Sequence, residues 1–184
     1  YVMLALGQPL HAFDLGTVDG PIVVRRARAD ERITTLDDVE RTLSAEDLVI
    51  TEGGERPLAI AGVMGGADSE IGPDTRDVLI EAAHFDPVSI ARSARRHRLP
   101  SEASRRFERG VDPAIVEVAL DVACALLVQI AGGTIEAGRT IITTGASPAF
   151  PNIPGIEGIG YLTSTTALEL TELPHSLLVL GGGY

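Results

Sequence analysis

The sequence contains no tryptophan and no lysine, a single cysteine, and only 4% aromatic residues. One cysteine, Cys124, excludes a disulfide framework, a dithiol redox pair and a cysteine-based zinc site, and it fits a reducing compartment. The net charge of -11 excludes a protein that coats nucleic acid by bulk positive charge, so any contact with RNA must be local. We expect no metal site, because the four histidines form no i, i+4 pair and have no carboxylates at ligand spacing.

Long uninterrupted hydrophobic runs are also scarce. The apolar stretch around Cys124 is interrupted by Glu117, Asp121 and Gln129, and we predict that it is too polar and too short for a membrane span. The N-terminus has neither the basic start nor the cleavage site of a signal peptide. The expectation is a cytoplasmic protein with no membrane partner.

What is present is a chain of 184 residues, 45% of them hydrophobic, enough for one domain and part of a second. Short apolar runs between turns predict strands at 22–27, 48–51, 57–63 and 77–85. Asp-Pro pairs predict helices that begin near 87 and 113, the first ending near 97 and the second, buried against the sheet, near 131. We therefore predict an α+β fold over residues 1–137, a boundary near 138–141, and a strand-rich, incomplete segment over 138–184.

Glu81 is the first candidate for a functional residue. It lies in the strand-like run VLIEAAHF, where its neighbours on either face are apolar. A buried carboxylate needs a partner or a purpose. The sequence leaves open an internal ion pair with an arginine and a role in chemistry.

All fifteen basic residues are arginine, which indicates either recognition of phosphate and carboxylate groups or the codon bias of a GC-rich genome. Seven of them lie between residues 92 and 109, against two glutamates: Arg92, Arg95, Arg96, Arg98, Arg105, Arg106 and Arg109. Such a strip is typical of a phosphate contact, and equally of a solvated helix face with acidic neighbours.

Several motifs, in order and spacing, resemble the B3/B4 region of the bacterial phenylalanyl-tRNA synthetase beta subunit. They are YVMLALGQPLHAFD, PLAIAGVMGG, VLIEAAHFDPVSIARSARRHRLPSEASRRFERGVDP and a long helix with IAGG, and together they cover residues 1–137. The resemblance implies a mixed sheet with packed helices. It also implies an editing domain that hydrolyses tyrosine from mischarged tRNA(Phe).

The resemblance gives roles to individual residues. His11 holds or polarises the water or the ester, and Glu81 hydrogen-bonds the tyrosine hydroxyl, which a synthetic pocket for phenylalanine does not strongly reject. The residues implied to shape the pocket are Gly65, Gly66, Ser101 and Ala103, and those that could contact RNA or another subunit are Arg92, Arg95, Arg96 and Arg105. No Ser-His-Asp or Cys-His arrangement is apparent, so we expect direct attack by water.

The implied partners are tRNA(Phe) and the synthetase alpha subunit of an α2β2 enzyme. ATP and Mg2+ belong to that intact enzyme, and we expect no cofactor on this chain. One alternative is a non-catalytic domain that binds RNA or a partner. Another comes from residues 139–184, where TTGASP, IPG and VLGGGY resemble FAD/NAD(P)-dependent disulfide oxidoreductases, mercuric reductases in particular. Without a flavin fingerprint or a redox cysteine pair, that resemblance implies no reductase activity.

Overall fold

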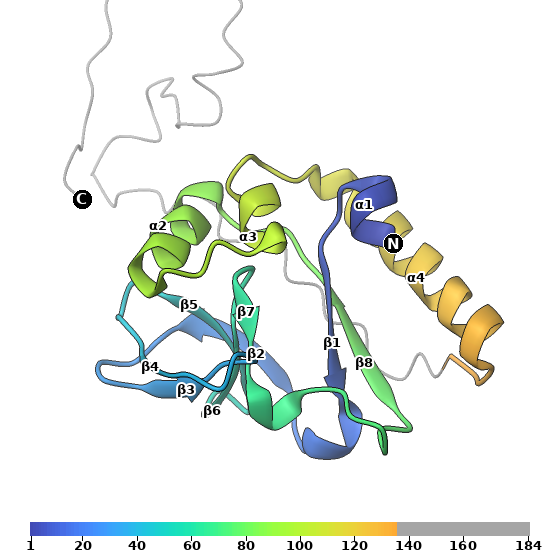
Figure 1. Ribbon diagram of the computed structural model, residues 1–184, viewed down its shortest axis with the longest axis horizontal. Helices are drawn as coiled ribbons and strands as arrows, with labels where there is room; N and C mark the ends of the chain where they lie inside the picture. Colours follow the sequence, from blue (N-terminus) through green and yellow to red (C-terminus); the bar gives the residue numbers. More distant parts are fainter. Residues whose placement is uncertain (136–184) are drawn as a thin grey trace, which may run out of the picture. The chain divides into compact units, whose positions relative to one another are not determined.

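The computed structural model describes residues 1–135, and the expectations for residues 138–184 lie outside that range. Its helices, shown in Figure 1, are α1 (Val2–Leu6), α2 (Pro87–His97), α3 (Glu102–Phe107) and α4 (Val116–Ala131), with 3-10 turns η1 (Leu15–Thr17), η2 (Ala67–Ser69) and η3 (Pro113–Ile115). The strands are β1 (Leu10–Asp14), β2 (Ile22–Arg26), β3 (Arg32–Thr34), β4 (Glu40–Thr42), β5 (Leu48–Glu52), β6 (Arg56–Ile60), β7 (Met64–Gly65) and β8 (Val78–Ala82). The predicted α+β fold is confirmed.

The described strands pair in three antiparallel groups. Four of them form a sheet in the order β2-β5-β6-β7, while β1 pairs with β8 and β3 pairs with β4. The register shifts between Ile50 and Thr51, where Thr51 lies opposite Pro57. Proline has no N–H to give to the ladder, which accounts for the irregularity at this point. The predicted strands at 22–27, 48–51, 57–63 and 77–85 correspond to β2, β5, β6 and β8.

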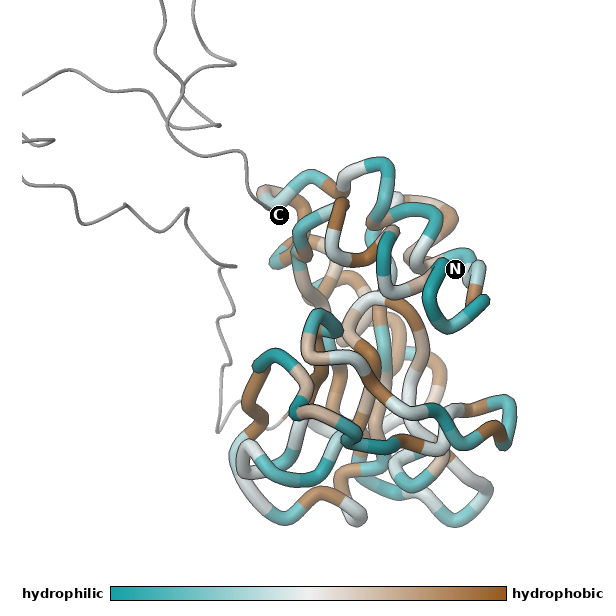
Figure 2. The backbone as a smooth tube through the Cα atoms, turned by 90° about the vertical axis from the view of Figure 1, so that its left-hand side faces the viewer, coloured by the Kyte–Doolittle hydropathy of each residue, from teal (hydrophilic) through white to brown (hydrophobic). Residues whose placement is uncertain are grey.

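The core lies between these strands and helices α2 and α3, which cover them in Figure 1. Figure 2 shows apolar segments gathered in the middle of this part of the chain. The largest fully buried apolar side chains are Phe13, Ile50, Leu58, Ile60 and Ile90. Helix α2 begins as predicted, because the Asp86 side chain accepts a hydrogen bond from the Ser89 N–H and proline follows at the first position.

The ribbon of β1 and β8 has apolar residues on both faces. Successive residues of a strand point to opposite sides. Phe13 and Leu79 therefore face the main core, whereas Leu10 packs with Val2 and with Ala119 of α4. This ribbon separates α4 and α1 from the rest of the core.

Helix α4 is much less buried than we predicted. Only Ala119 and Ala123 are buried, while Val118, Leu127 and Ile130 are exposed. A large apolar circumference predicted burial, but the ribbon is only two strands wide and contacts one narrow side of the helix.

The prediction that this stretch is too short and too polar for a membrane span was also wrong. Residues Pro113–Ala131 have a mean hydropathy of 2.1 over an 18-residue window and are long and apolar enough to cross a membrane by length and composition alone. A single helix of this kind is weak evidence for a membrane span.

Candidate active site

His11 and Glu81 lie directly opposite each other in the paired strands β1 and β8. Residues in register across an antiparallel pair point to the same face, with Cβ atoms about 5 Å apart. Because Phe13 and Leu79 share that face and belong to the main core, the imidazole and the carboxyl both point toward the interior. The structure thus brings together the two residues that sequence analysis placed in catalysis.

The carboxyl of Glu81 has no counter-charge. Its side chain is partly buried, and among residues 1–135 it forms neither an ion pair nor a side-chain hydrogen bond. Burial, with nothing to offset it, raises the pKa of Glu81 from its ordinary value of 4.5 to about 7. No arginine within residues 1–135 forms the internal ion pair that the sequence left open, and Glu81 retains its capacity to bind a hydrogen-bond donor.

The His11 imidazole is fixed by packing. Its ring meets that of Phe13 edge to face, with centroids 4.5 Å apart and planes at 80°. Burial lowers its pKa, so the ring is neutral at pH 7. Atom Nε2 is buried without a hydrogen-bond partner in the described part of the chain. A neutral imidazole with one unused nitrogen can accept a proton or orient a water molecule.

Gly65 makes space for this imidazole. A methyl group on Gly65 would lie 2.5 Å from Nε2 of His11, closer than real contacts allow. The resemblance assigned the open backbone at Gly65 to the entry of a substrate ring. The structure shows the His11 ring in that space, so Gly65 first of all determines where the imidazole lies.

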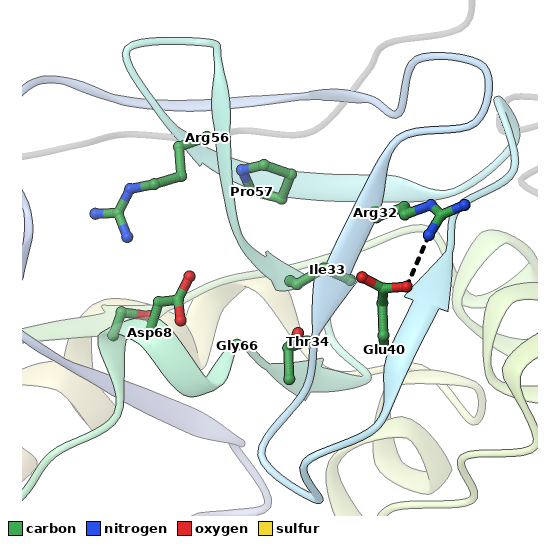
Figure 3. Close-up of a pocket in the computed structure, with 9 residues that line it drawn as sticks. Arg32, Ile33, Thr34, Glu40, Arg56, Pro57, Gly66 and Asp68 are labelled. Atoms are coloured by element: carbon green, nitrogen blue, oxygen red, sulfur yellow. Dashed lines mark hydrogen bonds and ion pairs between the residues drawn. The ribbon is translucent and has the colours of Figure 1, made fainter.

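Gly66, the next residue, belongs to a different environment. A side chain at this position would contact Ile33 and the carbonyl of Leu58. Gly66 also lines a pocket of about 170 Å³, shown in Figure 3, whose walls include Arg56, Asp68 and the ion pair between Arg32 and Glu40 at 2.8 Å. The two neighbouring glycines therefore face different surroundings, and only Gly65 contacts His11.

Ser101 and Ala103 both make contacts that hold the fold together. The Ser101 hydroxyl donates to the carbonyl of Val63 at 2.8 Å and accepts from the Ser104 N–H at 3.0 Å, which makes it the N-cap of α3. Since Val63 directly precedes β7, this contact ties α3 to the strand that carries Gly65. Ala103 packs against the main core. One acceptor position of the Ser101 hydroxyl remains for another partner.

Arg96 belongs to a buried polar cluster that sequence analysis missed. Asp47 is fully buried and accepts hydrogen bonds from the Ser93 hydroxyl at 2.7 Å, from His97 Nε2 at 2.7 Å and from Arg96. Burial favours the neutral acid, but bonds from His97, the Ser44 N–H and Ser93 hold the pKa of Asp47 well below its usual range. The cluster fastens α2 to the turn before β5.

A sequence signal for this cluster did exist. Residues 93, 96 and 97 have the i, i+3, i+4 spacing that places them on one face of a helix. All three are polar, and the helix face that they share points inward. A polar stripe on the buried face of a helix indicates a buried counter-charge.

The remaining arginines of the predicted strip differ in their partners. Arg105 pairs with Glu102 at 3.0 Å on the exposed side of α3. The Arg92 and Arg95 side chains are exposed on α2. The Arg95 guanidinium has no ion pair or hydrogen bond within residues 1–135. The strip thus combines a scaffold contact at Arg96 with a charge that is free for a ligand at Arg95.

Within residues 1–135, no group of three or more His, Cys, Asp or Glu side chains is arranged to hold a metal ion. The described site consists of the His11 imidazole, the Glu81 carboxyl and Gly65.

Comparison with known proteins identifies the class. Residues 1–132 match the B3/4 domain family, and the chain belongs to that family. Relatives include the phenylalanine–tRNA ligase beta subunits of Corynebacterium glutamicum, 52% identical over 98% of this chain and 22% of the relative, and of Corynebacterium jeikeium, 55% identical over 94% and 21%. That of Bifidobacterium longum is 58% identical over 72% of this chain and 16% of the relative. The chain spans about a fifth of the length of the curated relatives it matches.

These matches correct the interpretation of residues 139–184. An alignment over 98% of the chain extends through most of that segment, so the resemblance to the synthetase does not stop near residue 138. The comparisons give no support for an oxidoreductase fragment. Short glycine- and proline-rich turns beside apolar strands occur in many folds, which is why TTGASP and VLGGGY were misleading.

Proposed function

We propose that this domain hydrolyses the ester of tyrosine mischarged to tRNA(Phe). The observation that supports the proposal is the pairing of His11 with Glu81 on the inner face of the β1–β8 ribbon, each with an unused polar atom. Membership in the B3/4 family and similarity to phenylalanine–tRNA ligase beta subunits support the substrate.

Glu81 reads the substrate hydroxyl. A phenol donates its O–H to a carboxylate, and the Glu81 carboxyl is partly buried and has no other partner within residues 1–135. Phenylalanine in the same place would leave that carboxyl unpaired in an apolar setting. A site built to bind a hydroxyl rejects the analogue that lacks it by about 10⁴- to 10⁵-fold. Since the pKa of Glu81 is about 7, the ionised acceptor predominates above neutral pH.

His11 acts on the water. The oxygen of water attacks the ester carbonyl carbon, and the bond between that carbon and the ribose oxygen breaks. Nε2 of His11 takes the proton from the water and passes it to the departing ribose oxygen. The lowered pKa of His11 keeps the imidazole neutral and able to accept this proton at pH 7. Gly65 keeps the ring in the required place.

The partners, the cellular location and the cofactors of the reaction are also part of the proposal. We propose tRNA(Phe) and the ligase alpha subunit as partners, which the relatives' name, phenylalanine–tRNA ligase beta subunit, supports. We also propose a cytoplasmic location without a membrane partner. We assign ATP and Mg2+ to the intact ligase and none to this domain. We also assign Ser101, which bonds the Val63 carbonyl two residues before Gly65, and Ala103, which packs against the core, to the shaping of the substrate pocket.

The test is release of tyrosine from Tyr-tRNA(Phe) by the 184-residue chain, with Phe-tRNA(Phe) as the competing substrate. His11→Ala should slow release about 100-fold, the usual contribution of an acid–base residue. Glu81→Gln should reduce the preference for tyrosine over phenylalanine. His84→Ala is the matched control, because His84 bonds the Val111 carbonyl instead.

Equal release by the wild type and His11→Ala would contradict the proposed chemistry. Binding of tRNA without any release would favour the alternative of a domain that binds RNA or a partner and catalyses nothing.

A further inference from the structure

A groove of about 440 Å³ lies at the corner between α2 and α3, apart from His11 and Glu81. Its lining includes Ala94, Arg95, Arg98, Pro100, Arg105 and Glu108. None of these residues belongs to the site proposed for hydrolysis. The volume lies within the range of about 300–1,000 Å³ that is usual for small-molecule sites.

The charge of the groove is positive on an acidic protein. Three guanidinium groups face one carboxylate, that of Glu108. Arg105 forms an ion pair with Glu102, outside the groove lining. Arg95 and Arg98 have no ion pair or side-chain hydrogen bond in the described part of the chain. By contrast, Arg25, Arg28 and Arg41 each pair with a carboxylate. The groove therefore offers unused donors to an anion.

Arg98 occupies a backbone position that suits glycine. It ends α2 in the left-handed conformation, with φ 56° and ψ 40°, and its N–H bonds to the carbonyls of Ala94 and Arg95. Side chains destabilise this conformation, and glycine is the usual residue at such a helix end. A large cationic side chain kept at a strained position points to a function for that side chain.

The floor of the groove is apolar. Ala94 is buried, and Pro100 is exposed beside it. Apolar lining beside planar guanidinium groups suits the stacking of a nucleobase, and the arginine donors suit a phosphate. We propose that this groove binds a nucleoside monophosphate, either free or as one unit of single-stranded RNA. Arg95 and Arg98 hold the phosphate, and Glu108 accepts from a ribose hydroxyl.

The first experiment titrates the full chain with AMP at low salt, followed by calorimetry, beside adenosine and inorganic phosphate. We expect saturable binding of AMP with a Kd of about 1 mM and binding at least about tenfold weaker for adenosine and for phosphate. No saturable binding of AMP would overturn the proposal. Equal binding of phosphate and AMP would also overturn it, because the base would then contribute nothing.

The second experiment separates binding from folding. Arg98→Gly should weaken AMP about tenfold while the Tm stays equal or rises, because glycine relieves the left-handed position. Arg95→Ala should weaken AMP similarly. Two control variants should leave AMP binding intact. Asp38→Gly relieves a left-handed backbone conformation, with φ 58°, outside the groove, and Arg76→Ala removes one exposed arginine outside the groove. Unchanged AMP binding in both groove variants would overturn the proposal.

A short oligoadenylate distinguishes the two sources of the ligand. Tighter binding than AMP, lost in Arg98→Gly, assigns the groove to RNA; equal binding assigns it to the free nucleotide. Because AMP has no ester to a tyrosine, these results stand apart from the test of His11.

Discussion

Replacing Glu81 with glutamine should stabilise the protein at alkaline pH. In the folded protein the pKa of Glu81 is raised by burial from 4.5 to about 7. The folded state therefore holds this proton more tightly than the unfolded state does. Between these two pKa values, the free energy of unfolding falls as the pH rises, and above pH 7 the loss is complete. Glutamine resembles the neutral acid in shape and has no charge to lose.

The size of the effect follows from the pKa. Each pKa unit corresponds to about 1.36 kcal/mol, so a rise from 4.5 to about 7 limits the cost of ionising Glu81 to about 3 kcal/mol. The side chain retains some exposure, and water lowers the cost. We compare the free energies of unfolding of Glu81→Gln and the wild type at two pH values. From pH 4 to pH 8, this difference should shift by about 2 kcal/mol in favour of Glu81→Gln.

Urea unfolding of both proteins at pH 4, 6 and 8 measures this difference. Glu46→Gln, at an exposed glutamate, is the matched control and should follow the wild type at each pH. A constant separation of wild type and Glu81→Gln at all three pH values would refute the reasoning, because it would show that the Glu81 carboxyl ionises equally in both states.

Three further predictions concern other parts of the molecule. Gly65→Ala should slow tyrosine release about as much as His11→Ala, with little change in Tm, because the methyl group displaces the imidazole; an unchanged rate would contradict the role of Gly65. Asp47→Asn should lower the free energy of unfolding by about 3 kcal/mol at pH 7, since it removes a buried charge that holds His97 and Arg96. Because the pKa of Asp47 is depressed, this advantage of the wild type should be present above pH 3.8 and shrink as the pH falls below it, and an equal difference in urea unfolding at pH 7 and pH 3 would exclude that origin. Replacing Leu127 and Ile130 of α4 with glutamate should reduce concentration-dependent light scattering and change stability by only about 0.5 kcal/mol, and a large loss of Tm would mean that α4 is buried in solution.

Strands with strong periodicity and helices with clear caps were predictable from the sequence. Helix α2 has an Asp-Pro start, β2 and β5 are rich in β-branched residues, and β6 and β8 lie in short apolar runs between turns. The short strands β3, β4 and β7 were not predicted, because two or three residues carry too little pattern and their partners fix them. Strand β1, which carries His11, was not predicted either. The burial of α4 was overestimated because the apolar composition of a helix does not reveal the width of the surface that packs against it, here the two-stranded β1–β8 ribbon.

The candidate site was only partly readable from the sequence. The alternation around Glu81 predicted a carboxyl among apolar neighbours, and its pKa agrees with that prediction. The sequence did not show whether an arginine would reach it, because that depends on tertiary contacts. Asp47 was missed for the same reason: its three side-chain partners lie 46 to 50 positions further along the chain.

The pairing of β1 with β8 joins residues 70 positions apart, and this separation bears on the order of folding. Contacts between distant positions form only after the intervening loop has closed. His11 and Glu81 therefore come together in the same event, and they separate together when the ribbon frays. Under the proposed function, no partly folded form keeps the His11 imidazole, which activates water, in a pocket without Glu81, which recognises the tyrosine hydroxyl. The topology itself then protects correctly charged Phe-tRNA from a damaged domain.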